Sequence, residues 1–197
     1  MLGEFAPLSS FLLQPGTSYH YPTQEMRERI GLADPALDVM TDLRRVTAII
    51  IRPNETIDEA RKRMIECGVR LLLVLDTQRK VVGLITATDI LGEKPTLVVS
   101  ERGCRRQDVL VGDIMTPQAR LEVLDIRDVE HACVGHIVAT LRKTGRQHAM
   151  VVEFDSAGRQ MVRGLFSATQ IARQLGVAIE PDGMVNTFSE IEMLLAH

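Results

Sequence analysis

The sequence predicts an α+β protein built from two tandem copies of a β-α-β-β-α unit. The main observation is an internal repeat: residues 83–90 (GLITATDI) return as residues 164–171 (GLFSATQI), identical at five of eight positions. In each copy a short apolar run leads to a hydroxyl residue, and a polar side chain follows three residues later. This pattern is typical of a strand that continues into a capped helix. The chain is therefore expected to be an internal duplication.

The first copy is marked by clear start and stop signals. Thr56 and Glu59 fit a capping box, and Gly68 fits the end of the helix that the box begins. The expected elements are a strand at 46–51, a helix at 56–67, strands at 71–75 and 81–85, and a helix from 86 to about 91.

The second copy repeats this plan with a longer first helix, which Gly145 ends. The expected elements are a strand at 121–124, a helix at 128–143, strands at 149–154 and 161–166, and a helix at 167–175. A unit of ~60 residues buries little surface alone, so the two copies are expected to pack together.

Three segments lie outside the copies, which span 38–92 and 111–176. Residues 1–37 carry four of the seven aromatic residues and are expected to form a packing arm. Residues 93–110 are expected to be an exposed, mobile, basic linker. Residues 177–197 are expected to end in a short helix with an apolar face, preceded by a capping box at Ser189 and Glu192.

Composition excludes several functional classes. A net charge of −3 and a pI near 6.0 argue against a nucleic-acid-binding face, which is normally basic. No apolar run approaches the ~20 residues of a membrane span, so a cytoplasmic protein is expected. The three cysteines form no paired motif, and His131 and His136 are five residues apart, which does not suit two zinc ligands on one helix face. No metal site is therefore predicted.

The hydroxyl and acidic pair Thr86 and Asp89 has two interpretations. It can be an ordinary capping box that satisfies free backbone N–H groups at a helix start. It can also place a hydroxyl and a carboxylate where a ribose or phosphate would bind. Because the whole unit recurs, both interpretations remain open for the sequence.

At this point the chain resembles the CBS-domain family. The sequences DVMT at 38–41 and DIMT at 113–116 resemble the family's entry motif, and residues 83–89 resemble its exit motif. The resemblance covers roughly residues 38–176. It implies that the two repeats stack through their sheets about a pseudo-twofold axis, that two such modules form a homodimer, and that the clefts hold adenosine-containing ligands.

The resemblance transfers fully to Thr86 and Asp89 and only in part to Ser167, because Gln170 stands where the family pattern has an acid. A carboxylate can accept two hydrogen bonds from a cis-diol, whereas Gln170 has one acceptor oxygen and no charge. Arg70 matches a position that faces phosphates in nucleotide-binding members, although it can equally be a surface arginine. The apolar slot for adenine is expected at Ala48, Ile50 and Leu73.

Two functions follow from these expectations. The first is a regulatory module that binds AMP, ADP, ATP or S-adenosylmethionine as a regulatory ligand and modulates an unknown protein partner. The alternative is a dimerisation scaffold whose clefts have degenerated. No nucleophile elbow, P-loop or dinucleotide-binding motif supports an enzyme. No cofactor is certain from the sequence.

Overall fold

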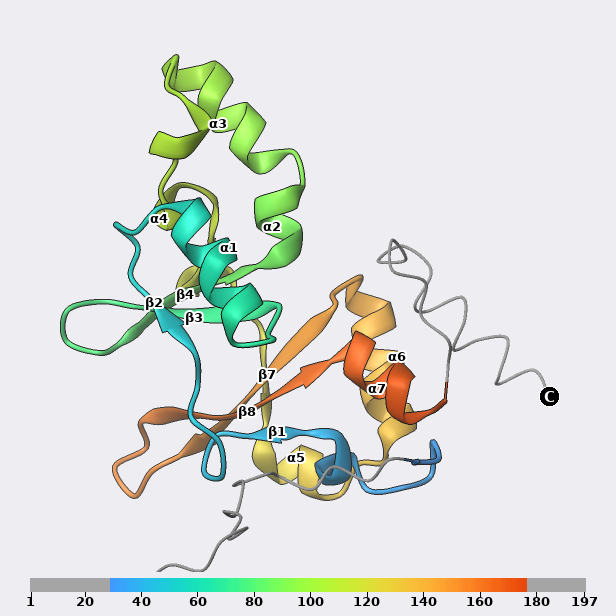
Figure 1. Ribbon diagram of the computed structural model, residues 1–197. Helices are drawn as coiled ribbons and strands as arrows, with labels where there is room; N and C mark the ends of the chain where they lie inside the picture. The colour runs from blue at the N-terminus through green and yellow to red at the C-terminus, as the bar shows by residue number, and fades with distance from the viewer. Residues whose placement is uncertain (1–28, 177–197) are drawn as a thin grey trace, which may run out of the picture.

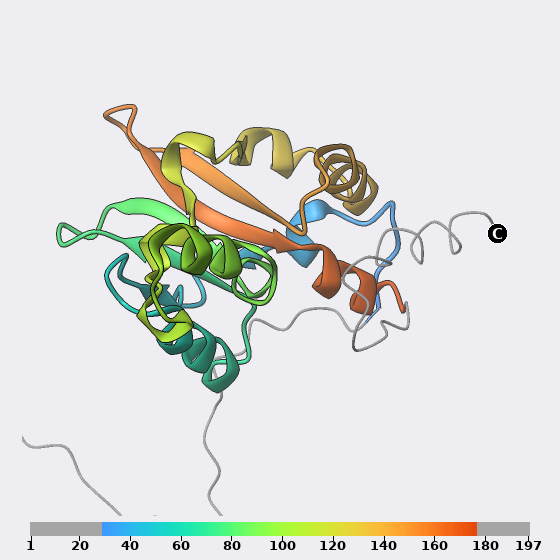
Figure 2. The same ribbon diagram turned by 90° about the horizontal axis from the view of Figure 1, so that it is seen from above.

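The computed structural model describes residues 29–176, in which two four-stranded sheets face each other (Figures 1 and 2). The first sheet has the order β2-β3-β4-β5 and the second has the order β1-β8-β7-β6. The mixed helix and strand content confirms the α+β class. The strands are β1 Thr41–Asp42, β2 Ile50–Ile51, β3 Leu71–Leu75, β4 Val81–Thr86, β5 Thr116–Pro117, β6 Val123–Asp125, β7 His148–Phe154 and β8 Gln160–Ser167.

Helices lie on the outer faces of the two sheets (Figure 2). The α-helices are α1 Ile57–Glu66, α2 Ala87–Leu91, α3 Lys94–Arg102, α4 Val111–Ile114, α5 Ile126–Glu130, α6 Val134–Thr144 and α7 Ala168–Gln174. Short 3-10 helices occur at Ala36–Val39, Arg106–Asp108 and Gln118–Arg120. Thr56 caps α1 and forms the predicted capping box with Glu59. The expected helix start is therefore confirmed.

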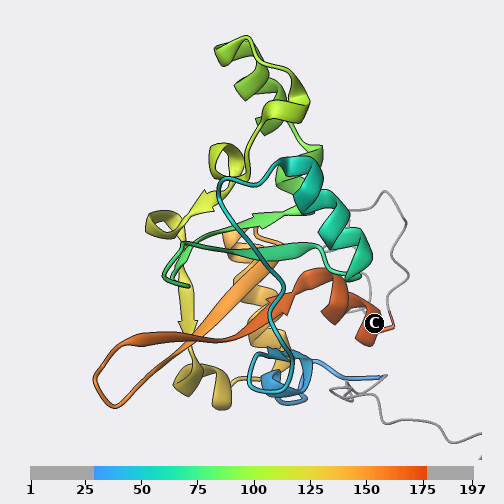
Figure 3. The ribbon, with the colours of Figure 1, turned by 60° about the vertical axis from the view of Figure 1, so that its left-hand side comes forward.

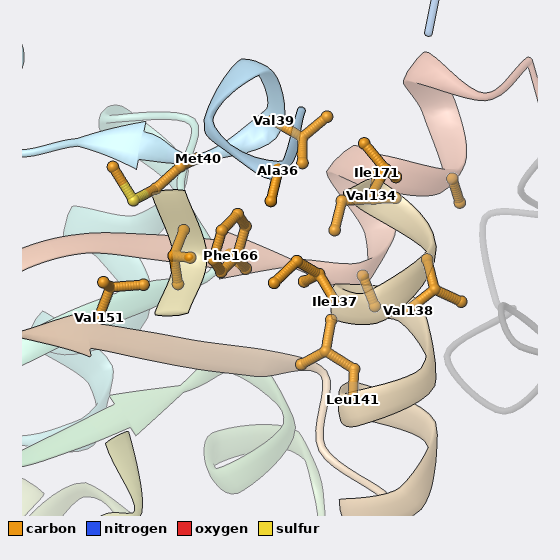
Figure 4. Packing of buried hydrophobic residues seen from close by; sticks show 13 residues of the cluster. Ala36, Val39, Met40, Val134, Ile137, Val138, Leu141, Val151, Phe166 and Ile171 are labelled. Carbon is orange, nitrogen blue, oxygen red and sulfur yellow. The ribbon is translucent and has the colours of Figure 1, made fainter. Parts of the chain in front are cut away.

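Each repeat lends its entry segment to the sheet of the other repeat. β1, which begins at Thr41, the last residue of DVMT, pairs antiparallel with β8. β5, which begins at Thr116, the last residue of DIMT, pairs antiparallel with β4. The core of the second unit accordingly includes Met40, which lies beside Phe166 in Figure 4. Phe166 is fully buried, and burying such a side chain contributes ~1.5–3 kcal/mol. The two units are thus tied together by exchanged strands.

A third apolar cluster joins the two sheets. It contains Leu71, Leu73 and Leu75 from β3 and Met150 from β7. Since alternate residues of a strand face the same side, these three leucines of β3 present one face to the other sheet. The expectation that the repeats pack through their sheets is met by this cluster.

The secondary structure predicted for two segments, 93–110 and 128–143, was wrong. Residues 93–110 contain helix α3, which has Pro95 near its start and ends at Gly103 in a left-handed conformation, so the connection is not an irregular loop. The single helix expected at 128–143 is divided into α5 and α6. At the break, Val134 N donates to Asp34 O at 2.9 Å and Ala36 N donates to Ala132 O at 2.9 Å. Bonds to this distant segment replace those of a continuous helix.

The first strands of both units are also shorter than expected. β2 covers only Ile50–Ile51 of the predicted 46–51, and β6 begins at Val123 and not at Leu121. The predicted arm up to residue 28 and the tail from 177, with its capping box at Ser189 and Glu192, lie outside the described residues. The remaining strands and α7 agree with the sequence prediction to within one or two residues.

Candidate functional site

Thr86 stands at the junction of β4 and α2 and caps the helix. Its Oγ1 accepts a hydrogen bond from Asp89 N at 3.2 Å, while Asp89 Oδ2 accepts from Thr86 N at 2.8 Å and from Thr86 Oγ1 at 2.7 Å. The exit motif therefore forms a complete capping box, as the sequence predicted. One carboxylate oxygen of Asp89 is fully engaged by this local structure.

The other oxygen of Asp89 has a partner that sequence reasoning missed. Lys94 Nζ lies 2.5 Å from Asp89 Oδ1 and also donates to Ile114 O at 3.1 Å. The Asp89 side chain is only 12% exposed, whereas that of Lys94 is 46% exposed. Lys94 belongs to α3, within the segment that the sequence predicts as a mobile linker, so the sequence does not indicate a cation here.

Thr86 and Asp89 line a cleft of about 280 Å³, called the Thr86 cleft below. Its opposite wall comes from the second repeat and includes Gln147 and His148. Arg146 Nη1 lies 3.1 Å from Glu122 Oε2 at the same cleft. Asp89 and Glu122 are thus each paired with a cation, while Arg120 adds a further positive charge to the lining of this cleft.

Ser167 lines a second, larger cleft of about 560 Å³, called the Ser167 cleft below. Ser167 caps α7, where its Oγ accepts from Gln170 N at 3.5 Å. Arg70 reaches this cleft from the first repeat and Arg173 from α7, and no carboxylate is among its lining residues. The cleft therefore has an excess of positive charge.

The two clefts are related by the internal repeat. Each combines the exit motif of one repeat with the loop before the central strand of the other, and both are lined by Leu71, His148 and Leu165. Arg70 consequently lines the Ser167 cleft and not the Thr86 cleft, although the sequence grouped it with Thr86 and Asp89. The position of Arg70 in the Ser167 cleft could not be predicted from the sequence, because it depends on how the two repeats face each other.

His148 stands where the two clefts meet. Burial and, to a smaller extent, the positive charge of Arg70 lower its pKa to about 4, while the negative charge of Asp89 acts in the opposite direction. The imidazole is therefore neutral at pH 7 and offers a hydrogen-bonding nitrogen without a charge.

The expected adenine slot lies elsewhere. Ala48, Ile50 and Leu73 line another cavity of about 1120 Å³, whose lining includes Arg79 and Lys80 next to the β3–β4 turn and Gln160 next to the β7–β8 turn. Figure 3 shows these two β-hairpins projecting from the same side of the protein. β3 shows the separation directly, because its first residue Leu71 lines both clefts and its last residue Leu75 lines this cavity. The seven predicted site residues are thus distributed over three cavities.

Two further properties bear on function. Within residues 29–176, no three His, Cys, Asp or Glu side chains are grouped as a metal site would require. In the same part of the chain, no helix has the length and apolar character needed to cross a bilayer.

Comparisons with known proteins agree with this architecture. Residues 36–95 match the CBS domain model. An uncharacterized conserved protein from Pyrococcus horikoshii has 20% identity and a TM-score of 0.53, and the match covers 77% of this chain and 98% of that one. A CBS-domain containing protein from Agrobacterium tumefaciens has 18% identity and a TM-score of 0.52, with coverage of 73% and 95%.

No curated protein matches the chain. At these identities the two solved structures establish the fold, while the family model identifies the first unit. Residues 36–95 thus match the CBS domain, and the described residues as a whole share the fold of these two solved structures.

Proposed function

We propose that the protein is a regulatory module that binds one anionic adenosine-type ligand in the Ser167 cleft and modulates a partner protein. The observation that supports this most strongly is the pair of guanidinium groups, Arg70 and Arg173, at a 560 Å³ cleft without a lining carboxylate. Its volume falls within the ~300–1,000 Å³ typical of small-molecule sites. Guanidinium groups bind phosphate oxygens through paired, charge-assisted hydrogen bonds.

The choice of cleft reverses the expectation from the exit motifs alone. Asp89 is chemically the better acceptor for a ribose diol, but Lys94 and Thr86 already engage both of its oxygens. A ligand in the Thr86 cleft would have to displace an ion pair. The Ser167 cleft has no carboxylate among its lining residues, so a ligand there would displace no such ion pair. In that cleft Ser167 and Gln170 would face the ribose.

Calorimetric titration with AMP, ADP, ATP, NAD and S-adenosylmethionine tests this proposal. At least one of them should bind with a stoichiometry of one per chain. Arg70→Gln should weaken a phosphate-bearing ligand ~10- to 100-fold, since a hydrogen bond to a charged group is worth ~1.5–3 kcal/mol. Arg61→Gln, an exposed change on α1 that does not line the Ser167 cleft, is the matched control and should leave affinity unchanged.

Asp89→Asn distinguishes the two clefts. If it weakens binding more than Arg70→Gln does, the ligand occupies the Thr86 cleft and our assignment is wrong. If none of the five compounds binds while the protein still assembles and engages a partner, the scaffold function replaces the regulatory one.

We also propose a homodimer that buries apolar side chains on the helical side of the first unit. Ile65 on α1, Leu91 on α2 and Leu97 on α3 are 69%, 61% and 57% exposed. Helices α1 and α2 also border a cavity of about 340 Å³ lined by Met64, Ile65 and Leu91. Light scattering should give a dimer mass, and Ile65→Glu should give a monomer that remains folded. A wild-type monomer at micromolar concentration would contradict this.

The remaining elements of the proposal concern setting and chemistry. We place the module in the cytoplasm, with no catalytic activity and no nucleic-acid partner of its own. The net charge of −3 supports the last point. The regulated partner protein would be found by its ligand-dependent association with the dimer.

A further inference from the structure

The largest cavity described in the structure lies away from both exit motifs. We call it the hairpin cavity, because it lies between the far ends of the β3–β4 and β7–β8 hairpins and has a volume of about 1120 Å³. The clefts at the exit motifs are lined by the opposite ends of the same strands. No residue lines both this cavity and the Ser167 cleft, whereas Leu121 and Met150 line both this cavity and the Thr86 cleft. A ligand here should therefore bind independently of one at Ser167.

The inner wall of the hairpin cavity is apolar and comes from both sheets. Leu73 and Leu75 project from β3, and Met150 and Val152 from β7. Three of these four belong to the apolar cluster that joins the sheets. The cavity thus continues the hydrophobic contact between the repeats outward to solvent. An apolar body could extend this contact and be removed from water, which is favourable at ~25 cal/mol per Å².

The rim of the hairpin cavity is cationic. Arg44, Arg45, Arg79 and Lys80 line it, and no carboxylate does. Arg44 is paired with Glu153 at 2.7 Å, and Arg45 lies 3.8 Å from Asp42. Within the described part of the chain, neither Arg79 nor Lys80 forms an ion pair, and both are exposed on the β3–β4 turn. Two cations at the mouth are therefore available to a bound anion.

We propose that the hairpin cavity binds an amphipathic anion, with its apolar chain between the sheets and its carboxylate or phosphate end at Arg79 and Lys80. Charge complementarity and the separation of apolar wall from basic rim support this class of ligand. A peptide is disfavoured because the inner wall is formed by side chains of the central strands β3 and β7, whose backbone groups are already paired on both sides. An extended peptide needs free backbone partners at a sheet edge.

Titration of the full chain with laurate below its micellar concentration tests the proposal. Laurate should bind at one per chain, and the neutral analogue dodecanol should bind ~3- to 10-fold more weakly, as expected for the loss of partly exposed ionic contacts. Arg79→Gln combined with Lys80→Gln should reduce laurate affinity by the same factor and remove most of its salt dependence. Both residues are exposed on a turn, so this variant should remain folded.

Ala48→Phe provides a steric test, because Ala48 is half-buried and lines the hairpin cavity. It should abolish laurate binding and leave nucleotide binding at the Ser167 cleft unchanged, so failure of this proposal is distinguishable from failure of the proposed function. Laurate binding that survives Ala48→Phe would indicate attachment to some other apolar surface and overturn the proposal. Displacement of laurate by AMP would assign the cavity to adenosine ligands. Laurate binding seen only after deletion of residues 1–28 would assign the cavity to that segment. Either result would also overturn the proposal.

Discussion

Lys94 Nζ lies 2.5 Å from Asp89 Oδ1, so the carboxylate of the first exit motif is held by a lysine of the same chain. Asp89 Oδ2 is held by Thr86 at the same time. The residue that the sequence marks as the better ribose acceptor is therefore the less available one. The lysine that holds this carboxylate lies outside both sequence motifs.

Lys94→Ala should open the Thr86 cleft. Without the ammonium group, Asp89 Oδ1 can accept from a cis-diol, so calorimetric stoichiometry should rise from one ligand per chain toward two. The stability cost should stay below about 1 kcal/mol, because the pair is partly exposed. Lys62→Ala is the control, since Lys62 pairs with Glu66 at 3.8 Å on exposed helix α1. An unchanged stoichiometry would show that Lys94 is not what closes this cleft.

Gly83 and Gly164 allow the exchanged strands to approach closely. A Cβ at Gly83 would lie 2.6 Å from Thr116 O, and a Cβ at Gly164 would lie 2.9 Å from Thr41 O. Gly83→Ala and Gly164→Ala should each lower the free energy of unfolding by ~1–3 kcal/mol, the range of overpacked sites. Chemical denaturation measures this.

Gly31→Ala is the matched control for these two glycines. Gly31 is exposed, and its added Cβ would come no closer than 3.9 Å to Asp34 Oδ2. The change should stay within about 0.5 kcal/mol. Equal effects of all three substitutions would mean that lost backbone freedom, and not the strand exchange, sets the cost.

The local signals in the sequence were reliable because they act within a few residues. The capping boxes at Thr56 and Thr86 depend on groups three residues apart, and they are present as predicted. Helix α3 also has local signals, Pro95 near its start and Gly103 at its end, but the basic residues around them are equally typical of an exposed loop. Because helix α3 was not predicted, the ion pair between Lys94 and Asp89 was not predicted either.

Other features could not have been read locally. The break between α5 and α6 is made by backbone bonds to Asp34 and Ala36, about a hundred residues away. The placement of Arg70 in the Ser167 cleft likewise results from the way the repeats pack. The sequence pattern within one repeat predicts the helices and strands of that repeat. Which residues line each cleft depends on how the two repeats pack against each other.

His148 should make stability depend on pH. Its folded pKa of about 4 is lower than the ordinary value of 6.5, so the unfolded chain takes up the proton first as pH falls. The contribution of the neutral ring is complete above pH ~6.5 and is lost progressively down to pH ~4. At ~1.4 kcal/mol per pKa unit, the shift from 6.5 to about 4 corresponds to a loss on the order of 3 kcal/mol.

His148→Leu, which introduces the residue found at the corresponding position 71, should remove this part of the pH dependence. Urea denaturation at pH 7 and pH 4.5 should show a smaller drop for the variant than for the wild type. The exposed His131 is the control, and His131→Asn should keep the wild-type slope. Equal slopes for all three proteins would mean that His148 is already solvated in the folded state.

Gln170→Asp should strengthen the Ser167 cleft, because it places a carboxylate at the position that Asp89 holds in the first exit motif. The capping geometry at Ser167 is retained, since Asp can serve at the third helical position as Asp89 does. Two hydrogen bonds from a cis-diol to a charged acceptor should raise affinity about tenfold for the tightest ligand of the nucleotide screen. The gain must disappear for the 2′-deoxy form of that ligand, because only one hydroxyl of the diol remains. An equal gain for both forms would show that the new charge acts on the whole cleft and does not contact the ribose.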